Sequence, residues 1–478
     1  MSKQWSTYQT AIFDFVENDK GNAIVEAVAG SGKTTTIVEA LSRCVGSTIF
    51  LAFNKSIAEE LKERGVDSRT FHSLTYAPVT RAKGVRSVDA NKLRGIVRDK
   101  FTEQDNKLYG NLVVKLVGLA RQAGVGCLVD DVPNVWAEII DHHDLEIDEG
   151  GTLPRAIELA QKTLALSNRV AAVDFDDLLY LAVKDGISLP KFDIVFVDEA
   201  QDTNAIQRAI LRKILKPGSR VIAVGDPAQA IYGFRGADSR SMDLIAEEFQ
   251  ATRLPLTVSY RCATSIVNFA RQWVAHIEAA PGAAEGSVEQ VEQWGPQSFD
   301  PKDLIVCRTT APLVKLAYQM LKAKVPARIL GREIGEGLIA LVEKLNAAGI
   351  ERLIDKLSAW EVREVEKAWA KDDEAKAQAV SDKADAIRCV IEGLPQTSYT
   401  VPALVEAIRS LFDGAKGATT LATIHKSKGL EADRVWWLNS SMCPSPWARK
   451  EWQQQQEINL CYVAATRAKT QLKLIEAQ

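Results

Sequence analysis

The sequence lacks any run of 18 apolar residues, and its first segment, Met1–Tyr8, is short and polar rather than an apolar leader. A helix needs about 20 apolar residues to cross a bilayer. Secretory leaders also carry an apolar stretch. We therefore expect a soluble, intracellular protein without a membrane partner, cytoplasmic in a bacterial or phage setting.

Cysteine is also sparse and scattered. There are seven cysteines in 478 residues, and no two form a CxxC pair. An odd number without paired spacing predicts neither a disulfide framework nor a zinc site. Reduced thiols in an intracellular compartment are the simpler interpretation.

The chain also lacks an excess of positive charge. Lys and Arg number 59 against 62 Asp and Glu, which gives a net charge of −3. The whole molecule is therefore not a basic nucleic-acid binder, and any such binding needs local patches and stacking residues. The length exceeds one ordinary domain and predicts two to four.

The first 75 residues alternate apolar runs with helical patterns. Ala23–Ala27 and Thr48–Phe53 are expected strands, followed by expected helices at Thr34–Arg43 and Ser56–Arg64. This βαβα order is typical of a parallel sheet. Tyr76–Val170 reads as mostly helical.

Strand patterns return further along, in two groups. The expected strands are Ile194–Val197, Val221–Val224, Leu304–Cys307, Thr420–Ile424 and Arg434–Leu438. A second helical stretch lies between Arg332 and Lys416, and its run Lys371–Arg388 is a solvated helix by composition. We predict α/β architecture with two parallel-sheet domains, residues 1–75 plus 171–253 and residues 254–331 plus 417–478. Each has a helical insertion, residues 76–170 and 332–416.

A glycine-rich turn follows the first expected strand and opens a helix. In AVAGSGKT, Ala27–Thr34, the two glycines let backbone N–H groups surround phosphate oxygens, although Ala27 replaces the first glycine of the general pattern. Lys33 can reach the β- and γ-phosphates, and Thr34 can bind Mg²⁺. The alternative is a structural turn before a helix. The candidate nucleotide-binding residues here are Ala29, Gly30, Ser31, Gly32, Lys33, Thr34 and Thr35.

An acidic pair follows the apolar strand near residue 197. Ligands bind at the carboxyl edge of an open α/β sheet, where Asp198 and Glu199 would emerge. Asp198 would hold Mg²⁺, and Glu199 would deprotonate the attacking water. Alone, such a pair is more often a surface loop or a helix cap.

Seven motifs occur in one order along the chain. They are TFHSL (Thr70–Leu74), DFDDLL (Asp174–Leu179), DEAQD (Asp198–Asp202), VGDPAQAIYGFRGA (Val224–Ala237), SYR (Ser259–Arg261), HKSKGLE (His425–Glu431) and YVAATRAK (Tyr462–Lys469). Together they resemble the motifs of UvrD/Rep-type superfamily-one DNA helicases. Within that family the chain also resembles the F-box DNA helicase core and small phage and bacterial relatives.

The resemblance implies two RecA-like P-loop domains with ATP and Mg²⁺ between them. It implies that Gln229 senses the γ-phosphate and that Arg261 and Arg467 act as arginine fingers, whose planar charge suits phosphoryl transfer. Tyr260 would stack on the adenine and Gln9 would read its edge. The implied contact to the nucleotide sugar region is Glu431. Interdomain salt bridges for the arginines, a core position for Tyr260 and a solvated position for Gln9 are the alternatives.

A single strand is held by phosphate contacts and aromatic platforms. The candidate DNA-binding residues are Phe53, Asn54, Lys55, Thr70, His72, Tyr232, Phe234, Arg235, His425 and Lys428. Phe53, Tyr232 and Phe234 could instead be core residues. Aromatic and basic residues also interleave at Trp447–Trp452, either as a strand-binding edge or as a loop anchored by its tryptophans.

The expected function is an ATP-dependent translocase and helicase acting on single-stranded and tailed duplex DNA. The resemblance implies 3′→5′ polarity. Two alternatives stay open, a translocase that strips proteins from DNA and unwinds weakly, and a nucleotide-switched DNA-binding scaffold without motor activity. RNA as the track is not excluded by the residues alone.

Overall fold

The computed structural model describes residues 4–233, 236–238, 240–370, 374–413 and 417–476. The chain divides into two units, residues 1–27 with 32–256 (unit 1) and residues 28–31 with 257–478 (unit 2). Each unit contains one six-stranded parallel sheet. The predicted class, two parallel-sheet α/β domains, is confirmed.

The sheet of unit 1 has the strand order β3-β2-β4-β5-β1-β6, and all its pairings are parallel. Its strands are β1 (Ala23–Ala27), β2 (Thr48–Leu51), β3 (Ser68–Arg69), β4 (Phe192–Val197), β5 (Leu215–Gly225) and β6 (Thr252–Leu256). β1, β2 and β4 are mostly apolar because both faces of the sheet are buried where they lie.

Successive residues of each strand enter different cores. Ile24 and Val195 belong to one cluster, and their neighbours Val25 and Phe196 belong to another. The second cluster contains residues of α1 (Thr7–Asn18), α2 (Lys33–Ser42) and α3 (Lys55–Glu63). The first contains residues of α9 (Phe175–Lys184), α10 (Ala205–Ile214) and α11 (Ser241–Phe249).

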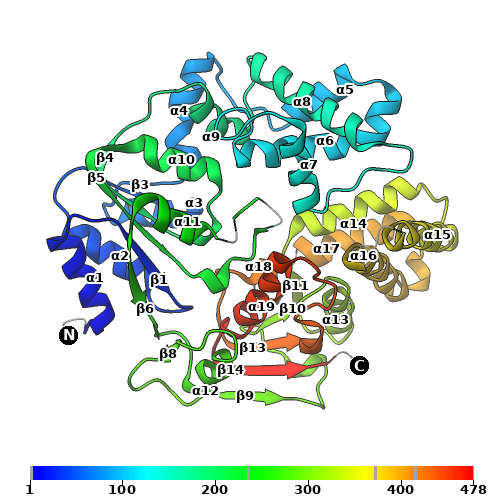
Figure 1. Ribbon diagram of the computed structural model, residues 1–478. Helices are drawn as coiled ribbons and strands as arrows, with labels where there is room; N and C mark the ends of the chain where they lie inside the picture. The colour runs from blue at the N-terminus through cyan, green and yellow to red at the C-terminus, as the bar shows by residue number, and fades with distance from the viewer. Residues whose placement is uncertain (1–3, 234–235, 239, 371–373, 414–416, 477–478) are drawn as a thin grey trace. The chain divides into compact units, whose positions relative to one another are not determined.

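The first cluster also continues into the helical insertion of unit 1, drawn in blue to cyan in Figure 1. Its helices are α4 (Phe71–Lys83), α5 (Lys92–Lys100), α6 (Glu103–Ala123), α7 (Pro133–His142) and α8 (Leu153–Arg169). Thr102 caps the start of α6, and Gly124, in the left-handed conformation, ends it. α6 packs against α5, α7, α8 and α9, so it is the central helix of the insertion.

The sheet of unit 2 has the order β11-β12-β10-β13-β14-β9, again with parallel pairings. Its strands are β9 (Ser287–Gln290), β10 (Leu304–Cys307), β11 (Ala327–Ile329), β12 (Thr419–Thr423), β13 (Ala432–Leu438) and β14 (Ala468–Ile475), beside a small pair, β7 (Val258–Ser259) and β8 (Glu278–Ala279). The helices of the sheet domain are α12 (Thr264–Ala270), α13 (Ala311–Lys322), α18 (Ile424–Ser427) and α19 (Glu451–Ala465). The insertion consists of α14 (Arg332–Leu345), α15 (Ile350–Trp369), α16 (Glu374–Gly393) and α17 (Val401–Asp413).

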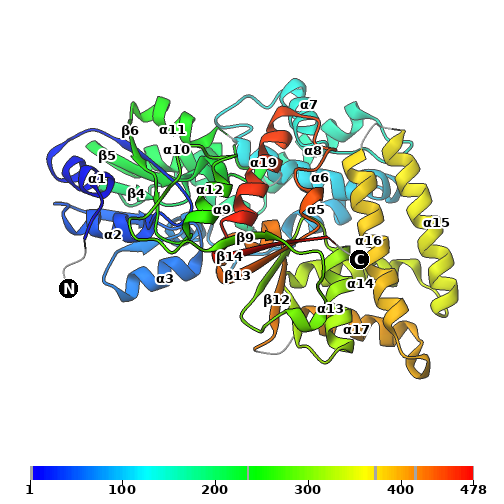
Figure 2. The same ribbon diagram turned by 90° about the horizontal axis from the view of Figure 1, so that it is seen from below.

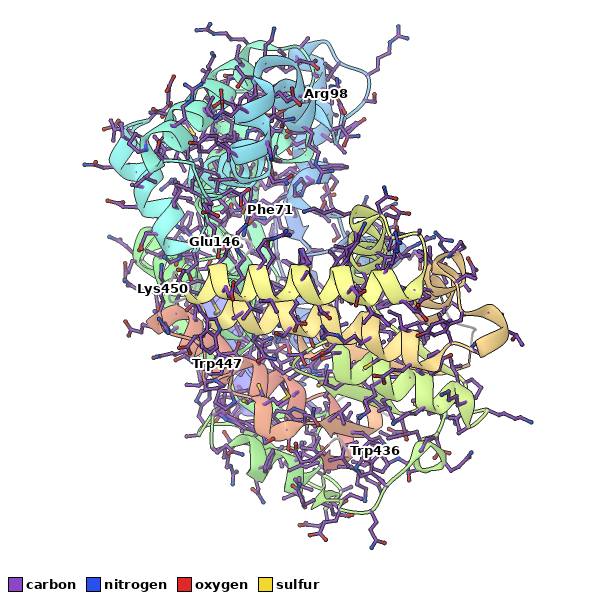
Figure 3. The ribbon with its side chains drawn as sticks, turned by 90° about the vertical axis from the view of Figure 1, so that its right-hand side faces the viewer. Phe71, Arg98, Glu146, Trp436, Trp447 and Lys450 are labelled. Atoms are coloured by element: carbon purple, nitrogen blue, oxygen red, sulfur yellow. The ribbon has the colours of Figure 1, made fainter. Side chains whose placement is uncertain are left out.

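α15 and α16 lie side by side, as Figures 2 and 3 show. The expectation that Lys371–Arg388 is a solvated helix is wrong for its described part. Ala384, Ala386 and Ile387 are fully buried in the core of unit 2. α16 packs against α13 and α15, and the residues that it buries there include small alanines. Alanines made the sequence of this helix look less hydrophobic than its burial requires. In the described part of the chain, no helix is both long and apolar enough to span a membrane.

Candidate functional site

The turn between β1 and α2 is shaped by its glycines. Gly30 and Gly32 have φ of 73° and 76°, in the left-handed region that glycine adopts without strain. A Cβ on Gly30 would lie 2.4 Å from the Cβ of Arg261, so no larger residue fits there. Tyr260 N–H also donates to Gly30 O at 2.8 Å, and Ala29 N–H donates to Tyr462 Oη at 2.8 Å. Residues 28–31 and these partners all belong to unit 2.

α2 begins at Lys33 immediately after this turn, and Thr34 and Thr35 lie in its first turn. Gly32 supplies no side-chain cap, so the first N–H groups of α2 are open to an anionic ligand. Ser31 Oγ is buried without a hydrogen-bond partner among the described residues. These groups fit the phosphates of a bound nucleotide.

Asp198 and Glu199 stand at the carboxyl end of β4, as the sequence predicts. Asp198 is only 4% exposed, and its Oδ1 accepts from Glu199 N–H at 2.9 Å. Glu199 has φ of 50°, a left-handed conformation that is uncommon for a residue with a Cβ. Such backbone outliers concentrate at functional sites. The carboxylate of Asp198 and the hydroxyl of Thr34 are oxygen groups of the kind that bind Mg²⁺.

Two residues that the sequence analysis did not single out connect this pair to Gln229. Gln201 donates through Nε2 to Glu199 Oε2, and its Oε1 accepts from Asp226 N–H at 3.1 Å. Asp226 in turn accepts at Oδ2 from Gln229 Nε2 at 2.6 Å. The chain of contacts Glu199–Gln201–Asp226–Gln229 lies wholly in unit 1. Both added residues stand inside quoted motifs, which was the available signal.

The pKa of Asp226 shows which charged groups lie near this site. Burial raises the pKa of Asp226, whereas Lys33 and the hydrogen bond from Gln229 oppose that rise and Glu199 adds to it. Lys33, Glu199 and Gln229 therefore act on one buried carboxyl group. The structure brings together the lysine, the acidic pair and the glutamine that the sequence assigned to one site.

Gln9 belongs to the same unit and is 4% exposed, so its alternative as a solvated residue is wrong. Its Oε1 accepts from Ser6 N–H at 3.0 Å in the capping box of α1, and its Nε2 donates to Thr36 Oγ1 at 2.9 Å. Because Thr36 lies on α2, Gln9 is fixed against the helix that carries Lys33.

In unit 2, Arg261 Nε lies 2.6 Å from Glu431 Oε2, and Lys469 Nζ lies 2.8 Å from the other oxygen. Burial raises the pKa of Glu431, but Lys469 and Arg261 outweigh it, so the pKa lies below its usual range. Tyr260 is 47% exposed, which excludes the core alternative and suits a stacking role.

Arg467 is 1% exposed and donates to carbonyls of its own unit, Val463 O at 2.9 Å and Leu430 O at 3.1 Å. Its guanidinium is thus held rigidly in place.

The strand-binding candidates of unit 1 are partly aromatic and partly helix caps. The rings of Phe53 and Tyr232 are 6.1 Å apart and within 8° of parallel, and Phe53 is 45% exposed, so the core alternative for Phe53 is wrong. Asn54 caps α3 and Thr70 caps α4. These two polar residues therefore have a structural role that the sequence did not predict.

The remaining candidates lie in both units, and His72 lines one pocket with Phe53 and Tyr232. Lys55 is exposed and lies 3.3 Å from Glu59, and His72 packs edge-on to Phe175 with ring centroids 6.5 Å apart. In unit 2, His425 lies in α18 and Lys428 at its C-terminal end. Phe234 and Arg235 lie outside the described residues.

The aromatic and basic segment Trp447–Trp452 precedes and enters α19 (Figure 3). Trp447 is 37% exposed, and Arg449 Nη2 lies 2.9 Å from Glu374 Oε1 at the start of α16. That ion pair ties the segment to the insertion of unit 2. Among the described residues, no group of His, Cys, Asp and Glu is arranged to hold a metal by itself.

Comparison with known proteins follows the same two-part division. The UvrD/REP helicase N-terminal domain matches residues 129–250, and the UvrD-like helicase C-terminal domain matches residues 400–478.

Among the relatives, the F-box DNA helicase protein 1 of Schizosaccharomyces pombe is 25% identical over 94% of this chain and 55% of its own length. The ATP-dependent DNA helicase UvrD1 of Mycobacterium tuberculosis is 27% identical over 53% of this chain and 37% of its own length. The ATP-dependent DNA helicase srs2 of S. pombe is 25% identical over 54% of this chain and 28% of its own length. The chain thus spans about half, or less, of the relatives it matches. It carries the N-terminal and C-terminal domains that characterise the UvrD/Rep helicase family.

Proposed function

We propose that this protein is an ATP-driven motor that moves along single-stranded DNA and unwinds tailed duplexes with 3′→5′ polarity. The observation that carries the proposal is the chain of hydrogen bonds from Glu199 through Gln201 and Asp226 to Gln229. It joins a hydrolytic site to the segment that leads, three residues later, to Tyr232 and its stacked partner Phe53. A site for ATP and a platform for bases share one segment.

ATP would bind with its phosphates over the N-terminus of α2. The uncapped N–H groups of that helix and the Lys33 ammonium attract the anionic oxygens. Thr34 and Asp198 are the residues that would hold Mg²⁺, which would neutralise phosphate charge when bound. Gln9 is held against α2 at 2.9 Å from Thr36, where its polar groups would select the base.

Hydrolysis requires a base for the attacking water, and we assign Glu199 to that step. Gln201 donates to the Glu199 carboxylate and so orients it. Arg261 and Arg467 are proposed to stabilise the negative charge that develops on the phosphates, a role in which an arginine contributes roughly 10³–10⁵ in rate. Arg467 suits this role because its guanidinium is held by backbone carbonyls.

Strand movement would follow from changes at Gln229. A γ-phosphate beside its amide competes with Asp226 for the Nε2 hydrogens, so binding and hydrolysis would shift the segment that ends at Tyr232. Base stacking on an aromatic side chain is worth about 1–3 kcal/mol. Phe53, Tyr232 and His72 would form the grip in unit 1, with His425 and Lys428 in unit 2.

Steady-state ATP hydrolysis with and without oligo(dT) tests the motor. We expect turnover to rise at least tenfold with the oligonucleotide, because the strand and the nucleotide share the segment from Gln229 to Tyr232. A nucleotide-switched scaffold would bind both ligands with no rise in turnover, and that result would refute the proposal.

A duplex with a 3′ or a 5′ single-stranded tail tests polarity. Unwinding of the 3′-tailed duplex alone is expected. Unwinding of only the 5′-tailed duplex would contradict the assignment. Displacement of a protein from single-stranded DNA without duplex unwinding would instead favour the protein-stripping translocase. The same duplexes made of RNA test whether DNA is the track.

A further inference from the structure

Unit 1 has a pocket of about 260 Å³ that the stacked pair Phe53 and Tyr232 helps to line. Its lining comes from the insertion and from the sheet domain. Besides the two rings it includes His72, Arg121, Gln122, Asp176, Leu179, Asp202, Asn204, Ile206, Gln207 and Ala237. Aromatic rings and aliphatic side chains therefore accompany two carboxyl groups and three amides.

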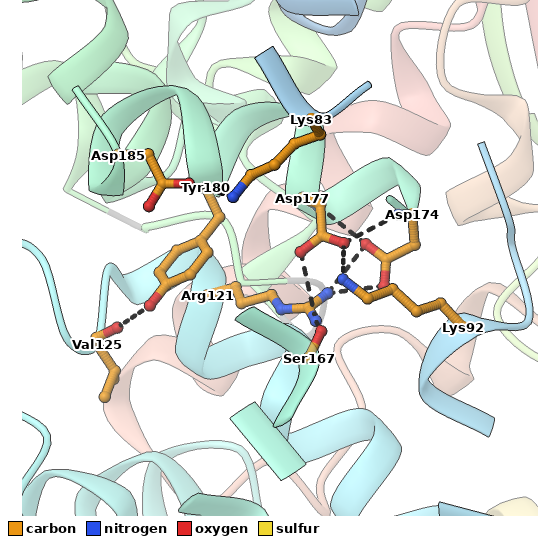
Figure 4. A network of polar contacts seen from close by, with 9 residues as sticks. All are labelled: Lys83, Lys92, Arg121, Val125, Ser167, Asp174, Asp177, Tyr180 and Asp185. Carbon is orange, nitrogen blue, oxygen red and sulfur yellow. Dashed lines mark hydrogen bonds and ion pairs between the residues drawn. The ribbon is translucent and has the colours of Figure 1, made fainter. Parts of the chain in front are cut away.

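The described lining is unsuited to a phosphate. Arg121 is already committed, since its Nη1 donates to both oxygens of Asp174 at 2.8 and 2.9 Å and its Nη2 lies 3.4 Å from Asp177 Oδ1 (Figure 4). Lys92 Nζ is 2.5 Å from the other oxygen of Asp177. Burial lowers the pKa of His72, which keeps that ring neutral near pH 7. An uncharged, flat, polar-edged group fits this pocket better than an anion.

Asp176 is one of the carboxyl groups that line this pocket, and its Oδ2 lies over α6, 3.4 Å from the position that a Cβ on Gly118 would occupy. Burial, together with Asp174, raises the pKa of Asp176 to about 6, while Arg121 and Gln122 oppose the rise. At pH 7.5 the group is thus mainly a carboxylate, which only accepts hydrogen bonds.

We propose that Asp176 makes this pocket select nucleobases that carry an exocyclic amino group over thymine and uracil. This inference rests on the proposed function, because the base would come from the strand held by Phe53 and Tyr232. The amino group of cytosine or adenine donates a hydrogen bond, whereas thymine and uracil present a carbonyl oxygen at the equivalent edge. A carboxylate stabilises the first and repels the second.

The amides on the opposite part of the lining can complete the recognition. Asn204 and Gln207 use their oxygens in the capping box of α10, at 3.0 and 2.9 Å. Their NH₂ groups are then the atoms available to donate to ring nitrogens and carbonyls of a base. The preference would make stepping depend on sequence, even though phosphate contacts supply most of the affinity.

Equilibrium binding of labelled oligo(dC) and oligo(dU) of equal length tests the proposal at pH 7.5 and fixed salt. The two strands share their phosphates, so backbone attraction cancels in the ratio. The bases differ at position 4, amino in cytosine and carbonyl in uracil, and at N3, which accepts a hydrogen bond in cytosine and donates one in uracil. Wild-type protein should bind oligo(dC) about fivefold or more tightly than oligo(dU), the lower end of the discrimination from one good base-edge contact. Asp176→Asn keeps the size of the side chain, and its NH₂ can donate to uracil, so the ratio should fall to within about twofold.

Asp185→Asn is the matched control. Asp185 follows the last residue of α9, the helix that carries Asp176, and its carboxylate pairs with Lys83 outside the pocket. Its ratio should equal that of the wild type. A wild-type ratio within twofold of one, or an unchanged ratio in Asp176→Asn, would overturn the base preference while leaving the motor intact. The ratio of affinities measured on the wild-type protein tests the base preference even if a variant is too unstable to assay. Failure to bind either strand would overturn both the proposed function and this inference.

Discussion

At the scale of single residues, Gln201 joins the two halves of the proposed hydrolytic site. Gln201→Ala removes the donor to Glu199 and the acceptor of Asp226 N–H together. Loss of a partner that orients a catalytic group costs about 10–100-fold. We expect kcat of the strand-stimulated ATPase to fall within that range while KM for ATP changes little, measured in steady state.

Gln201→Glu separates orientation from charge. The glutamate keeps an acceptor for Asp226 N–H but places a second negative charge beside Glu199, which raises the pKa of Glu199. The rising limb of the pH profile of kcat should therefore move to higher pH. A wild-type kcat and pH profile in both variants, with intact thermal melting, would show that Gln201 only fills space.

The sequence predicted the positions of the proposed reactive residues better than it predicted the partners of those residues. Lys33, Asp198 and Glu199 were placed at the ends of elements, because glycine spacing and an apolar strand fix those positions. Asp226 and Gln201 were missed since their contact joins segments 25 residues apart, and no spacing rule shows which motif residues pair. The capping roles of Asn54 and Thr70 were likewise hidden behind their proposed contacts to DNA.

At the scale of elements, one phenylalanine within β2 and one just after it have opposite surroundings. Phe53 follows the strand and is 45% exposed, whereas Phe50 within it is fully buried. Phe53→Ala should leave the melting temperature nearly unchanged and weaken single-strand binding by about 1–3 kcal/mol, the value of one stacked base. Fluorescence anisotropy and thermal melting measure the two effects.

Phe50→Ala is the contrasting variant and should cost about 3–5 kcal/mol of unfolding free energy. A large loss of stability in Phe53→Ala, or unchanged strand affinity, would contradict its assignment as a platform.

The insertion of unit 1 is fastened to α9 by the buried cluster of Arg121, Asp174, Asp177 and Lys92 (Figure 4). Arg121→Met keeps the volume but leaves two buried carboxyl groups without their shared cation. Breaking a buried pair in this way costs about 3–5 kcal/mol, which urea denaturation would measure. Arg155→Met removes the ion pairs that a partly exposed arginine of α8 makes with Asp105 and Glu158, and its loss of stability should be clearly smaller. Equal losses in the two variants would disprove the special role of the cluster.

The sequence predicted central strands and missed edge strands. β1 and β10 have the predicted bounds, because strands buried on both faces are short apolar runs. The edge strands β6 and β9 were missed, and so was β14, because half of the residues in its sequence AKTQLKLI are polar. α16 was read as solvated because packing between helices, not composition, buries its alanines.

At the scale of the whole molecule, the fold class and the family resemblance are confirmed by two sheets and two matched domains. The ordered motifs made this prediction possible, since seven spaced segments specify a family far more narrowly than one P-loop. Polarity and the balance between unwinding and translocation stay predictions, because they depend on how a bound strand moves rather than on any residue type.

The most direct test of an ATP-driven motor on single-stranded DNA is turnover in Glu199→Gln, with Glu63→Gln as the control, since Glu63 lies exposed at the end of α3. The glutamine keeps the shape of residue 199 but removes the base, a group that contributes about 10²–10⁴ in rate. Strand-stimulated ATP hydrolysis should fall at least about 100-fold in Glu199→Gln, with binding of ATP and oligo(dT) retained, and should be unchanged in Glu63→Gln. Equal turnover in the wild type and Glu199→Gln would contradict the proposed mechanism.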